Sequence, residues 1–211
     1  MCGIIGIQNN PESAMLAYMG LYAQQHRGQE GAGVVSTDGS QLYRHMGQGL
    51  VSDVFSDSDV FDGLIGESSI GHVRYSTTGN SDKKNVGPLT FNMGDYFLSI
   101  AHNGNLVNIE EIRKDLHNQG TLFQTSTDTE IIIHLIAREK GKNLAEKVEK
   151  VLSKIEGAYS LLLLSPSEII AARDPHGIRP FCMGKLQDTI VFASETCALD
   201  LLGAEYLRDV Q

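Results

Sequence analysis

The second residue of the chain, Cys2, carries the two groups that a self-activated nucleophile needs. A small side chain at position 2 permits removal of Met1, which would leave a thiol and a free α-amine on one residue. An α-amine titrates near pH ~8, so Cys2 could contain its own base. A buried cysteine at the start of a strand is the competing interpretation, and the position alone favours it.

Four polar segments, three of which contain glycine, add further groups for chemistry. Each ends or interrupts an apolar stretch, and each alone has a structural explanation as a turn or a helix cap. They cover residues 25–33 (Gln-His-Arg-Gly-Gln-Glu-Gly-Ala-Gly), 71–77 (Gly-His-Val-Arg-Tyr-Ser-Thr), 101–106 (Ala-His-Asn-Gly-Asn-Leu) and 125–130 (Thr-Ser-Thr-Asp-Thr-Glu).

Together with Cys2, these segments contain the parts for acyl transfer at an amide. Attack on a carbonyl forms an oxyanion that needs hydrogen-bond donors, and Asn103 offers a side-chain N–H while Gly104 offers an unobstructed backbone N–H. The guanidinium of Arg74 can hold a carboxylate with two hydrogen bonds. The carboxylate of Asp128 can hold an α-ammonium group. An amino acid with a side-chain amide needs all of these groups.

The elements that must position these groups follow a mixed order. Strands are expected at 2–7, 33–44 (a hairpin), 69–75 and 96–102, then three helices, then short strands between 158 and 193. A helix is expected at 12–26 and a short one at 196–202. This order lacks the regular alternation of a parallel doubly wound sheet. We expect one α+β domain, with antiparallel sheets and helices on their outer faces.

Composition excludes several functional classes. The 211 residues carry a net charge of -9 without a basic patch, so nucleic acid is not an expected partner. No apolar run approaches the ~18 residues of a membrane span, and no secretion signal is visible, so we expect a cytoplasmic protein with no membrane partner. Three cysteines, Cys2, Cys182 and Cys197, lack the number and spacing of a disulfide framework or metal site. We expect no metal or cofactor in this domain.

In their order along the chain, these segments resemble the glutaminase domain of class II glutamine amidotransferases, which are N-terminal nucleophile hydrolases. The opening Cys-Gly-Ile-Ile-Gly-Ile belongs to the pattern, which continues through residues 157–159, 172–180 and 193–198. Within this family, Gln-Glu-Gly at 29–31 favours the amidophosphoribosyltransferases. Glucosamine-6-phosphate synthases typically have Tyr-Asp-Ser there, and asparagine synthetase and glutamate synthase fit less well.

The resemblance implies a fold, a reaction and a set of site residues. The fold is a four-layer αββα sandwich, and the reaction is attack of Cys2 on the side-chain amide of L-glutamine, release of ammonia and hydrolysis of a thioester to glutamate. The implied roles are an oxyanion hole at Asn103 and Gly104, a carboxylate site at Arg74 with Thr77, an ammonium site at Asp128 with Gly104 nearby, ordering of the N-terminus by Arg27, and structural roles for His72 and His102.

The family also implies a second domain that this sequence lacks. Amidophosphoribosyltransferases continue into a C-terminal phosphoribosyltransferase domain, whose pyrophosphate-binding loop is not found in residues 1–211. We therefore expect a glutaminase domain that supplies ammonia for phosphoribosylamine formation in purine synthesis, with that second domain as a partner in cis or in trans. Mg and, in some relatives, an iron–sulfur cluster belong to the absent part. A homo-oligomer is compatible with this interpretation, and we expect a propeptide no longer than Met1.

Three alternatives stay open from the sequence. The chain could be the glutaminase domain of another class II enzyme, such as glucosamine-6-phosphate synthase. It could be a different N-terminal-cysteine amide hydrolase, such as a penicillin or bile-salt acylase, although Arg74 and Asp128 together favour a zwitterionic amino acid. It could also bind glutamine without turnover if Met1 is retained, because an acylated nitrogen is not a base.

Overall fold

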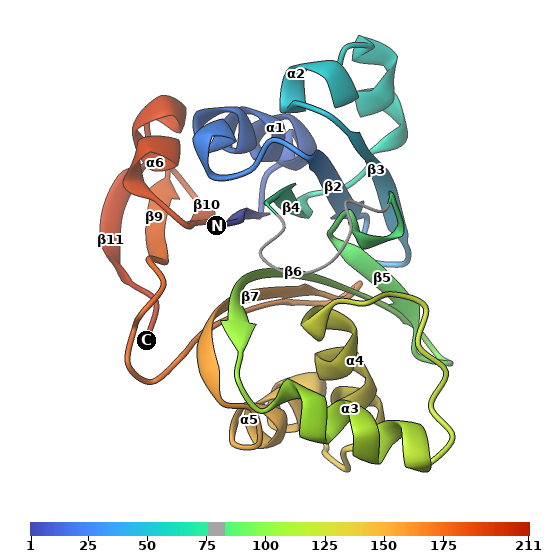
Figure 1. Ribbon diagram of the computed structural model, residues 1–211. Coiled ribbons are helices and arrows are strands. Elements are labelled where there is room, and N and C mark those ends of the chain that lie inside the picture. Colours follow the sequence, from blue (N-terminus) through green and yellow to red (C-terminus); the bar gives the residue numbers. More distant parts are fainter. Residues whose placement is uncertain (76–82) are drawn as a thin grey trace.

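Two antiparallel sheets lie face to face at the centre of the molecule, and helices cover the outer face of each (Figure 1). The computed structural model describes residues 1–75 and 83–211. Among these residues, a seven-stranded sheet has the order β11-β9-β10-β1-β4-β2-β3, and a four-stranded sheet has the order β5-β6-β7-β8. All the strand pairs in both sheets are antiparallel.

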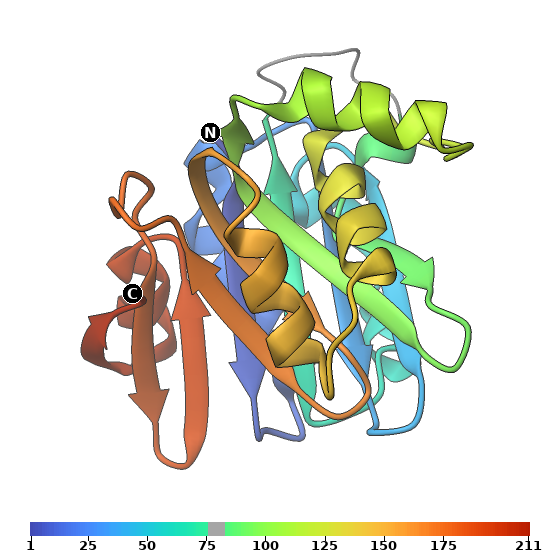
Figure 2. The same cartoon turned by 90° about the horizontal axis from the view of Figure 1, so that it is seen from below.

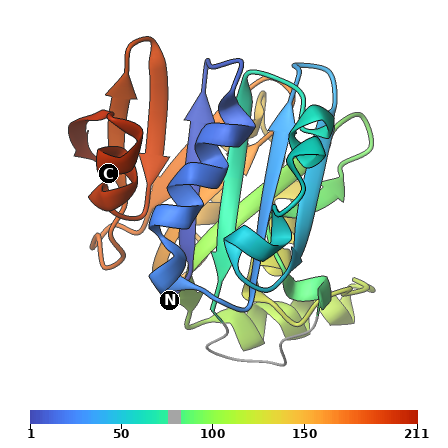
Figure 3. The ribbon, with the colours of Figure 1, turned by 90° about the horizontal axis from the view of Figure 1, so that it is seen from above.

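The larger sheet carries helices that pack mainly on its central strands. Helix α1 lies across β1, β4 and β2 (Figure 3). The strands are β1 (Gly3–Gln8), β2 (Gly31–Thr37), β3 (Leu42–Gln48), β4 (Ser68–Arg74), β9 (Cys182–Leu186), β10 (Thr189–Ala193) and β11 (Glu205–Asp209). The helices on this side are α1 (Ser13–Ala23), α2 (Val51–Val54) and α6 (Thr196–Leu202), with 3-10 turns η1 (Gln25–Arg27) and η2 (Ser58–Gly63).

The smaller sheet carries the three remaining helices on its outer side (Figure 2). Its strands are β5 (Leu89–Asn92), β6 (Phe97–Leu106), β7 (Gly157–Leu164) and β8 (Ile169–Arg173). The helices are α3 (Ile109–Asn118), α4 (Asp128–Arg138) and α5 (Leu144–Leu152), and a further 3-10 turn, η3, covers Lys83–Asn85. None of the helices in the described ranges is long and apolar enough to cross a membrane.

Three apolar clusters account for the layers. One cluster, with Ile5 and Leu21, lies between the larger sheet and its helices. A second, with Ile132 and Leu161, lies between the smaller sheet and its helices. The third, with Ile4 and others from both sheets, fills the space between them. Because burial of apolar area is the main driving force for such packing, these clusters explain why the layers form. The predicted α+β fold, a four-layer αββα sandwich, is confirmed.

One local prediction near the site was wrong. Strand β6 was expected to end at His102, but it continues to Leu106, because residues 103–106 pair with 157–160 of β7. Asn108 directly precedes α3 and makes no side-chain cap. Its amide donates to the carbonyl of Lys154 at 2.9 Å and accepts from the N–H of Glu156 at 3.0 Å, so it ties α3 to the start of β7.

Candidate active site

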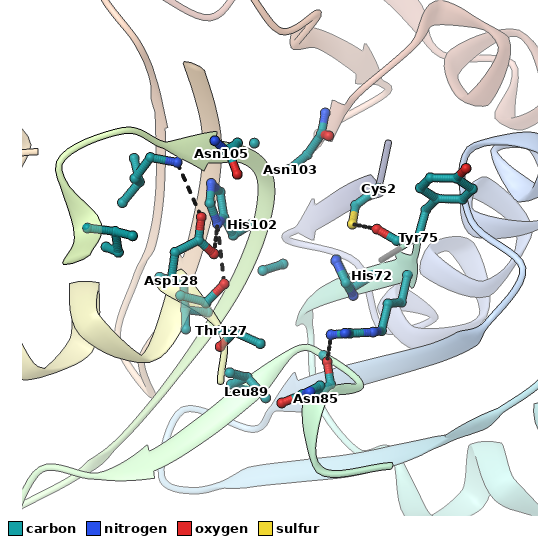
Figure 4. A pocket seen from close by; sticks show the side chains of 18 of the residues that line it. Cys2, His72, Tyr75, Asn85, Leu89, His102, Asn103, Asn105, Thr127 and Asp128 are labelled. Carbon is teal, nitrogen blue, oxygen red and sulfur yellow. Dashed lines mark hydrogen bonds and ion pairs between the residues drawn. The ribbon is translucent and has the colours of Figure 1, made fainter. Parts of the chain in front are cut away.

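A cavity of about 300 Å³ lies where the amino terminus meets the ends of β4 and β6. The side chains that line it come from both sheets and from the start of α4 (Figure 4). Seven of the predicted site residues line this cavity: Cys2, His72, Arg74, His102, Asn103, Gly104 and Asp128. Arg27 contacts the backbone of Cys2. Thr77 lies outside the described residues.

The backbone of Cys2 is held by two side chains that also hold each other. Nε of Arg27 donates to the Cys2 carbonyl at 2.9 Å. In the amide orientation that satisfies both of its neighbours, Asn103 donates to the same carbonyl at 3.0 Å and accepts from Nη2 of Arg27 at 3.2 Å. The Cys2 thiol faces the carbonyl of Tyr75 at 3.6 Å (Figure 4). The nucleophile candidate is therefore fixed by backbone contacts while its sulfur stays at the cavity.

Arg27 is itself oriented from the far end of the chain. Its Nη1 donates to the carboxylate of Glu195, which His26 also contacts at 3.0 Å. Burial alone would raise the pKa of Glu195, but the hydrogen bonds from Arg27 and His26 hold that pKa below its usual value. Glu195 is thus ionised at neutral pH and compensates the buried guanidinium of Arg27.

Asn103 and Gly104 lie side by side in β6 at the edge of the cavity. An amide NH₂ has two hydrogens, so Asn103 can donate one to Cys2 and keep one for an oxyanion. A Cβ on Gly104 would lie 2.1 Å from the carbonyl oxygen of Ala158 and 2.6 Å from Nε2 of His102. Only glycine fits at this position, because β7 and the imidazole of His102 leave no room for a side chain.

Arg74 ends β4 with its guanidinium buried beside the cavity. Its Nη1 donates to the backbone carbonyl of Asn85, and its Nε lies 3.6 Å from the carboxylate of Glu30. The segment before β2 packs on the backbone of Arg74, since a Cβ on Gly28 would lie 2.6 Å from the Arg74 carbonyl. The contacts with Asn85 and Glu30 hold the guanidinium at the cavity, where it can bind a carboxylate of a ligand.

Asp128 begins α4 and forms a pair with His102 from β6. Its Oδ1 lies 3.3 Å from Nδ1 of His102, and its Oδ2 accepts from the N–H of Leu106 at 3.3 Å. Burial alone would lower the pKa of His102, but the Asp128 carboxylate raises it above the usual value. Burial alone would raise the pKa of Asp128, but His102 lowers it. The carboxylate is therefore ionised and available to a cation in the cavity.

His72 lies beneath the cavity on β4 and is a poor candidate for a general base. Burial, with the nearby charge of Arg74, lowers the pKa of His72 to about 3. A group with this pKa accepts protons weakly near neutral pH. Its Nδ1 has no hydrogen-bond partner in the described part of the chain, and Gly87 packs over the ring. This environment agrees with the structural role expected for His72.

Several residues that complete the site were not recognised from the sequence. Glu195, Glu30 and Asn85 each hold one of the predicted arginines, but the sequence analysis assigned none of them a role, although Glu30 lies within the 25–33 segment. For Glu195, its place in the 193–198 segment was the available signal. Within residues 1–75 and 83–211, no group of three or more His, Cys, Asp or Glu is arranged to hold a metal ion.

The loop before Asp128 is anchored by the buried carboxylate of Glu130. This carboxylate accepts from the N–H of Gln124 at 2.8 Å, from the N–H of Thr125 at 2.7 Å and from the Thr125 hydroxyl at 2.8 Å. Arg113 adds a second brace, donating to the carbonyl of Thr127 at 2.9 Å. The position of Asp128 therefore depends on a carboxylate that does not line the cavity.

Replacing Glu130 with glutamine should loosen this loop. The side-chain NH₂ of glutamine would face N–H groups, so at least one buried donor loses its acceptor, and we expect unfolding free energy to fall by about 1–3 kcal/mol. Urea denaturation measures this loss. Glu149→Gln on the exposed side of α5 is the matched control and should change stability by less than about 0.5 kcal/mol. Equal stability of the two variants would contradict the anchoring role.

Comparisons with known proteins agree with the arrangement of these residues. A family model described as a glutamine amidotransferase domain matches residues 72–201. The amidophosphoribosyltransferase of Bacillus subtilis is 46% identical over 211 residues, which are 100% of this chain and 44% of that protein. The chloroplastic amidophosphoribosyltransferase 3 of Arabidopsis thaliana is 47% identical over 210 residues, which are 99% of this chain and 39% of that protein.

A solved structure has the same fold over the whole chain. It is glutamine phosphoribosylpyrophosphate amidotransferase from B. subtilis, complexed with ADP and GMP, and it superposes with a TM-score of 0.94 at 46% identity. The match covers 100% of this chain and 45% of that one. The chain therefore spans less than half the length of each of these relatives.

Proposed function

The chain belongs to the glutamine amidotransferase domain family, and on that premise we propose that it hydrolyses the side-chain amide of L-glutamine through a thioester on Cys2. One observation carries the proposal: a thiol, two oxyanion donors and two oppositely charged side chains line one cavity. Arg74 is placed to bind the α-carboxylate of glutamine, and Asp128 to bind its α-ammonium group. The amide would then lie between Cys2 and the Asn103–Gly104 edge of β6.

The chemistry begins once Met1 has been removed. The freed amine of Cys2 takes the thiol proton, directly or through water, and the sulfur attacks the amide carbon. The oxyanion accepts hydrogen bonds from the second N–H of Asn103 and the backbone N–H of Gly104. As the C–N bond breaks, the protonated amine returns its proton to the leaving nitrogen, and ammonia departs. Water then attacks the thioester and gives one proton to the amine. As the C–S bond breaks, the ammonium returns that proton to the departing sulfur, and the product leaves as a carboxylic acid that loses its proton to solvent, which gives glutamate.

The wider role extends beyond the length of this chain. Since the full-length relatives are named amidophosphoribosyltransferases, we propose that the ammonia is used for phosphoribosylamine formation in purine synthesis by a C-terminal phosphoribosyltransferase domain. Mg and, in some family members, an iron–sulfur cluster would belong to that domain. Residues 29–31 support this assignment over glucosamine-6-phosphate synthase.

A substrate comparison tests the proposed hydrolysis. The chain with Met1 removed, verified by intact mass, should release glutamate and ammonia in equal amounts from L-glutamine. It should not cleave an N-acylated amine that lacks the α-amino and α-carboxylate groups. Preference for the acylated amine would favour an acylase, and binding of glutamine without release of ammonia would favour a non-catalytic sensor.

A further inference from the structure

A third arginine reaches the Cys2 end of the cavity, and the proposed mechanism gives it no role. Arg179 lines the same cavity as Cys2, and its Nη1 lies 2.6 Å from the thioether sulfur of Met1. A thioether is a weak hydrogen-bond acceptor. Nε of Arg179 is buried and lacks a partner in the part of the chain that the structure describes. The guanidinium thus approaches the amino terminus without a strong acceptor of its own.

The backbone that carries Arg179 is fixed. Residues 174–181 cross from the four-stranded to the seven-stranded sheet (Figure 1). The buried carboxylate of Asp174 accepts from the N–H of Ile178 at 3.3 Å and 3.2 Å through its two oxygens. Nε of Arg173 donates to the Arg179 carbonyl at 2.6 Å. Gly177, with φ +59, allows the tight turn. Arg179 is therefore presented to the cavity by a braced turn.

The positive charge of Arg179 is not balanced within the site. Arg27 is paired with Glu195, and Arg74 lies 3.6 Å from Glu30. Among residues 1–75 and 83–211, no carboxylate lies within ion-pair distance of Arg179. Since Coulomb interactions are strong where water is partly excluded, this charge acts on the α-amine at the amino terminus and disfavours its ammonium form. Among the described residues, the other charged or titratable groups that line this cavity or pair with the residues beside Cys2 are Arg27, Glu30, His72, Arg74, Tyr75, His102, Glu110, Arg113, Asp128 and Glu195.

We propose that Arg179 is a positioning residue of the Cys2 centre, whose charge keeps the freed amine neutral after Met1 is removed, so that the amine can take the proton of the thiol. A nearby cation disfavours an ammonium group. The amine is then ready to accept a proton before glutamine binds. The α-amine of Met1, which is the amino terminus in this structure, already shows the effect of a nearby cation. Burial lowers the pKa of the Met1 α-amine, and Arg27 and Arg179 lower it further, against the opposing effects of Cys2 and Glu30.

The inference rests on the proposed hydrolysis, and pH profiles of Arg179 variants test it. We expect Arg179→Met to move the acid limb of kcat/KM, and the pH dependence of Cys2 alkylation by iodoacetamide, to higher pH by about one unit. The rate on the pH-independent plateau should stay within about threefold of the rate of the unsubstituted sequence. Arg179→Lys should keep both profiles near those of the unmodified sequence. Arg208→Met, which removes the same charge from β11 away from the cavity, is the matched control.

The outcomes separate this inference from the function on which it rests. Unshifted profiles in Arg179→Met, or an equal shift in Arg208→Met, would overturn the role of Arg179. A loss of rate at every pH without a shift would also overturn it, because that is the signature of a structural residue. If Arg179→Met does not fold, Arg179→Gln gives the same comparison. Failure of the unsubstituted, processed chain to hydrolyse glutamine would instead refute the proposed function, while alkylation would still report on Arg179.

Discussion

Replacement of Cys2 by alanine is expected to abolish glutamate release while leaving glutamine binding nearly intact. The thiol is the only side-chain group of Cys2, and within the described part of the chain its sulfur contacts the carbonyl of Tyr75 and neither Arg74 nor Asp128, the proposed binding groups. Loss of a covalent nucleophile costs about 10⁴-fold or more in kcat. Arg74 and Asp128 remain in place, so the glutamine dissociation constant, measured by calorimetry, should change by less than about threefold.

Two controls make the Cys2 result specific. Cys182→Ala should retain turnover, because burial raises the pKa of that thiol to about 11 and it does not line the cavity. A chain with an uncleaved residue before Cys2 keeps the thiol but blocks the amine. Its kcat should fall by about 10²–10⁴-fold, which is the range for a missing general base. Turnover by Cys2→Ala at the normal rate would exclude the thioester mechanism.

The sequence predicted the chemical groups of the site better than it predicted the residues that hold those groups in position. Cys2, Arg74 and Asp128 are recognisable because each supplies a group that amide hydrolysis of an amino acid requires, and all three line one cavity. The αββα layers followed from the family resemblance and are present. By contrast, Arg27 is oriented by Glu195, which is 168 residues away in sequence. A contact of that separation exists only after β10 pairs with β1, and no local pattern encodes it.

The Asn103–Gly104 segment illustrates a second limit. An Asn-Gly pair is a strong turn signal when only neighbouring residues are considered. Here both residues continue β6, because β7 supplies a partner strand through Ser160 and Tyr159. Tertiary pairing overrode the local preference, as is common for strands. This pairing matters for the proposed oxyanion donors, since groups held by a sheet are more rigid than groups on a free loop.

Asp128→Asn is expected to produce the largest effect among substitutions that leave Cys2 intact. Asp128 is ionised and faces the cavity, and the α-ammonium of glutamine would lose its only proposed counter-ion. Loss of one partner from a buried charge pair costs about 3–4 kcal/mol, so kcat/KM should fall roughly 10²–10³-fold, mainly through KM. Asp115→Asn on the exposed face of α3 should leave kcat/KM unchanged. Steady-state kinetics of glutamate release measure both.

A substrate without the amine shows whether the loss arises from that charge pair. With 4-carbamoylbutanoate, which is glutamine without its α-amine, the unsubstituted chain should already be slow, and Asp128→Asn should slow it by less than about threefold more. The two changes are then non-additive, as expected when they remove the same interaction. If Asp128→Asn instead slowed both substrates equally, Asp128 would act by supporting His102, which lies 3.3 Å away, rather than by binding the ammonium group. The cycle therefore separates substrate binding from support of the neighbouring imidazole.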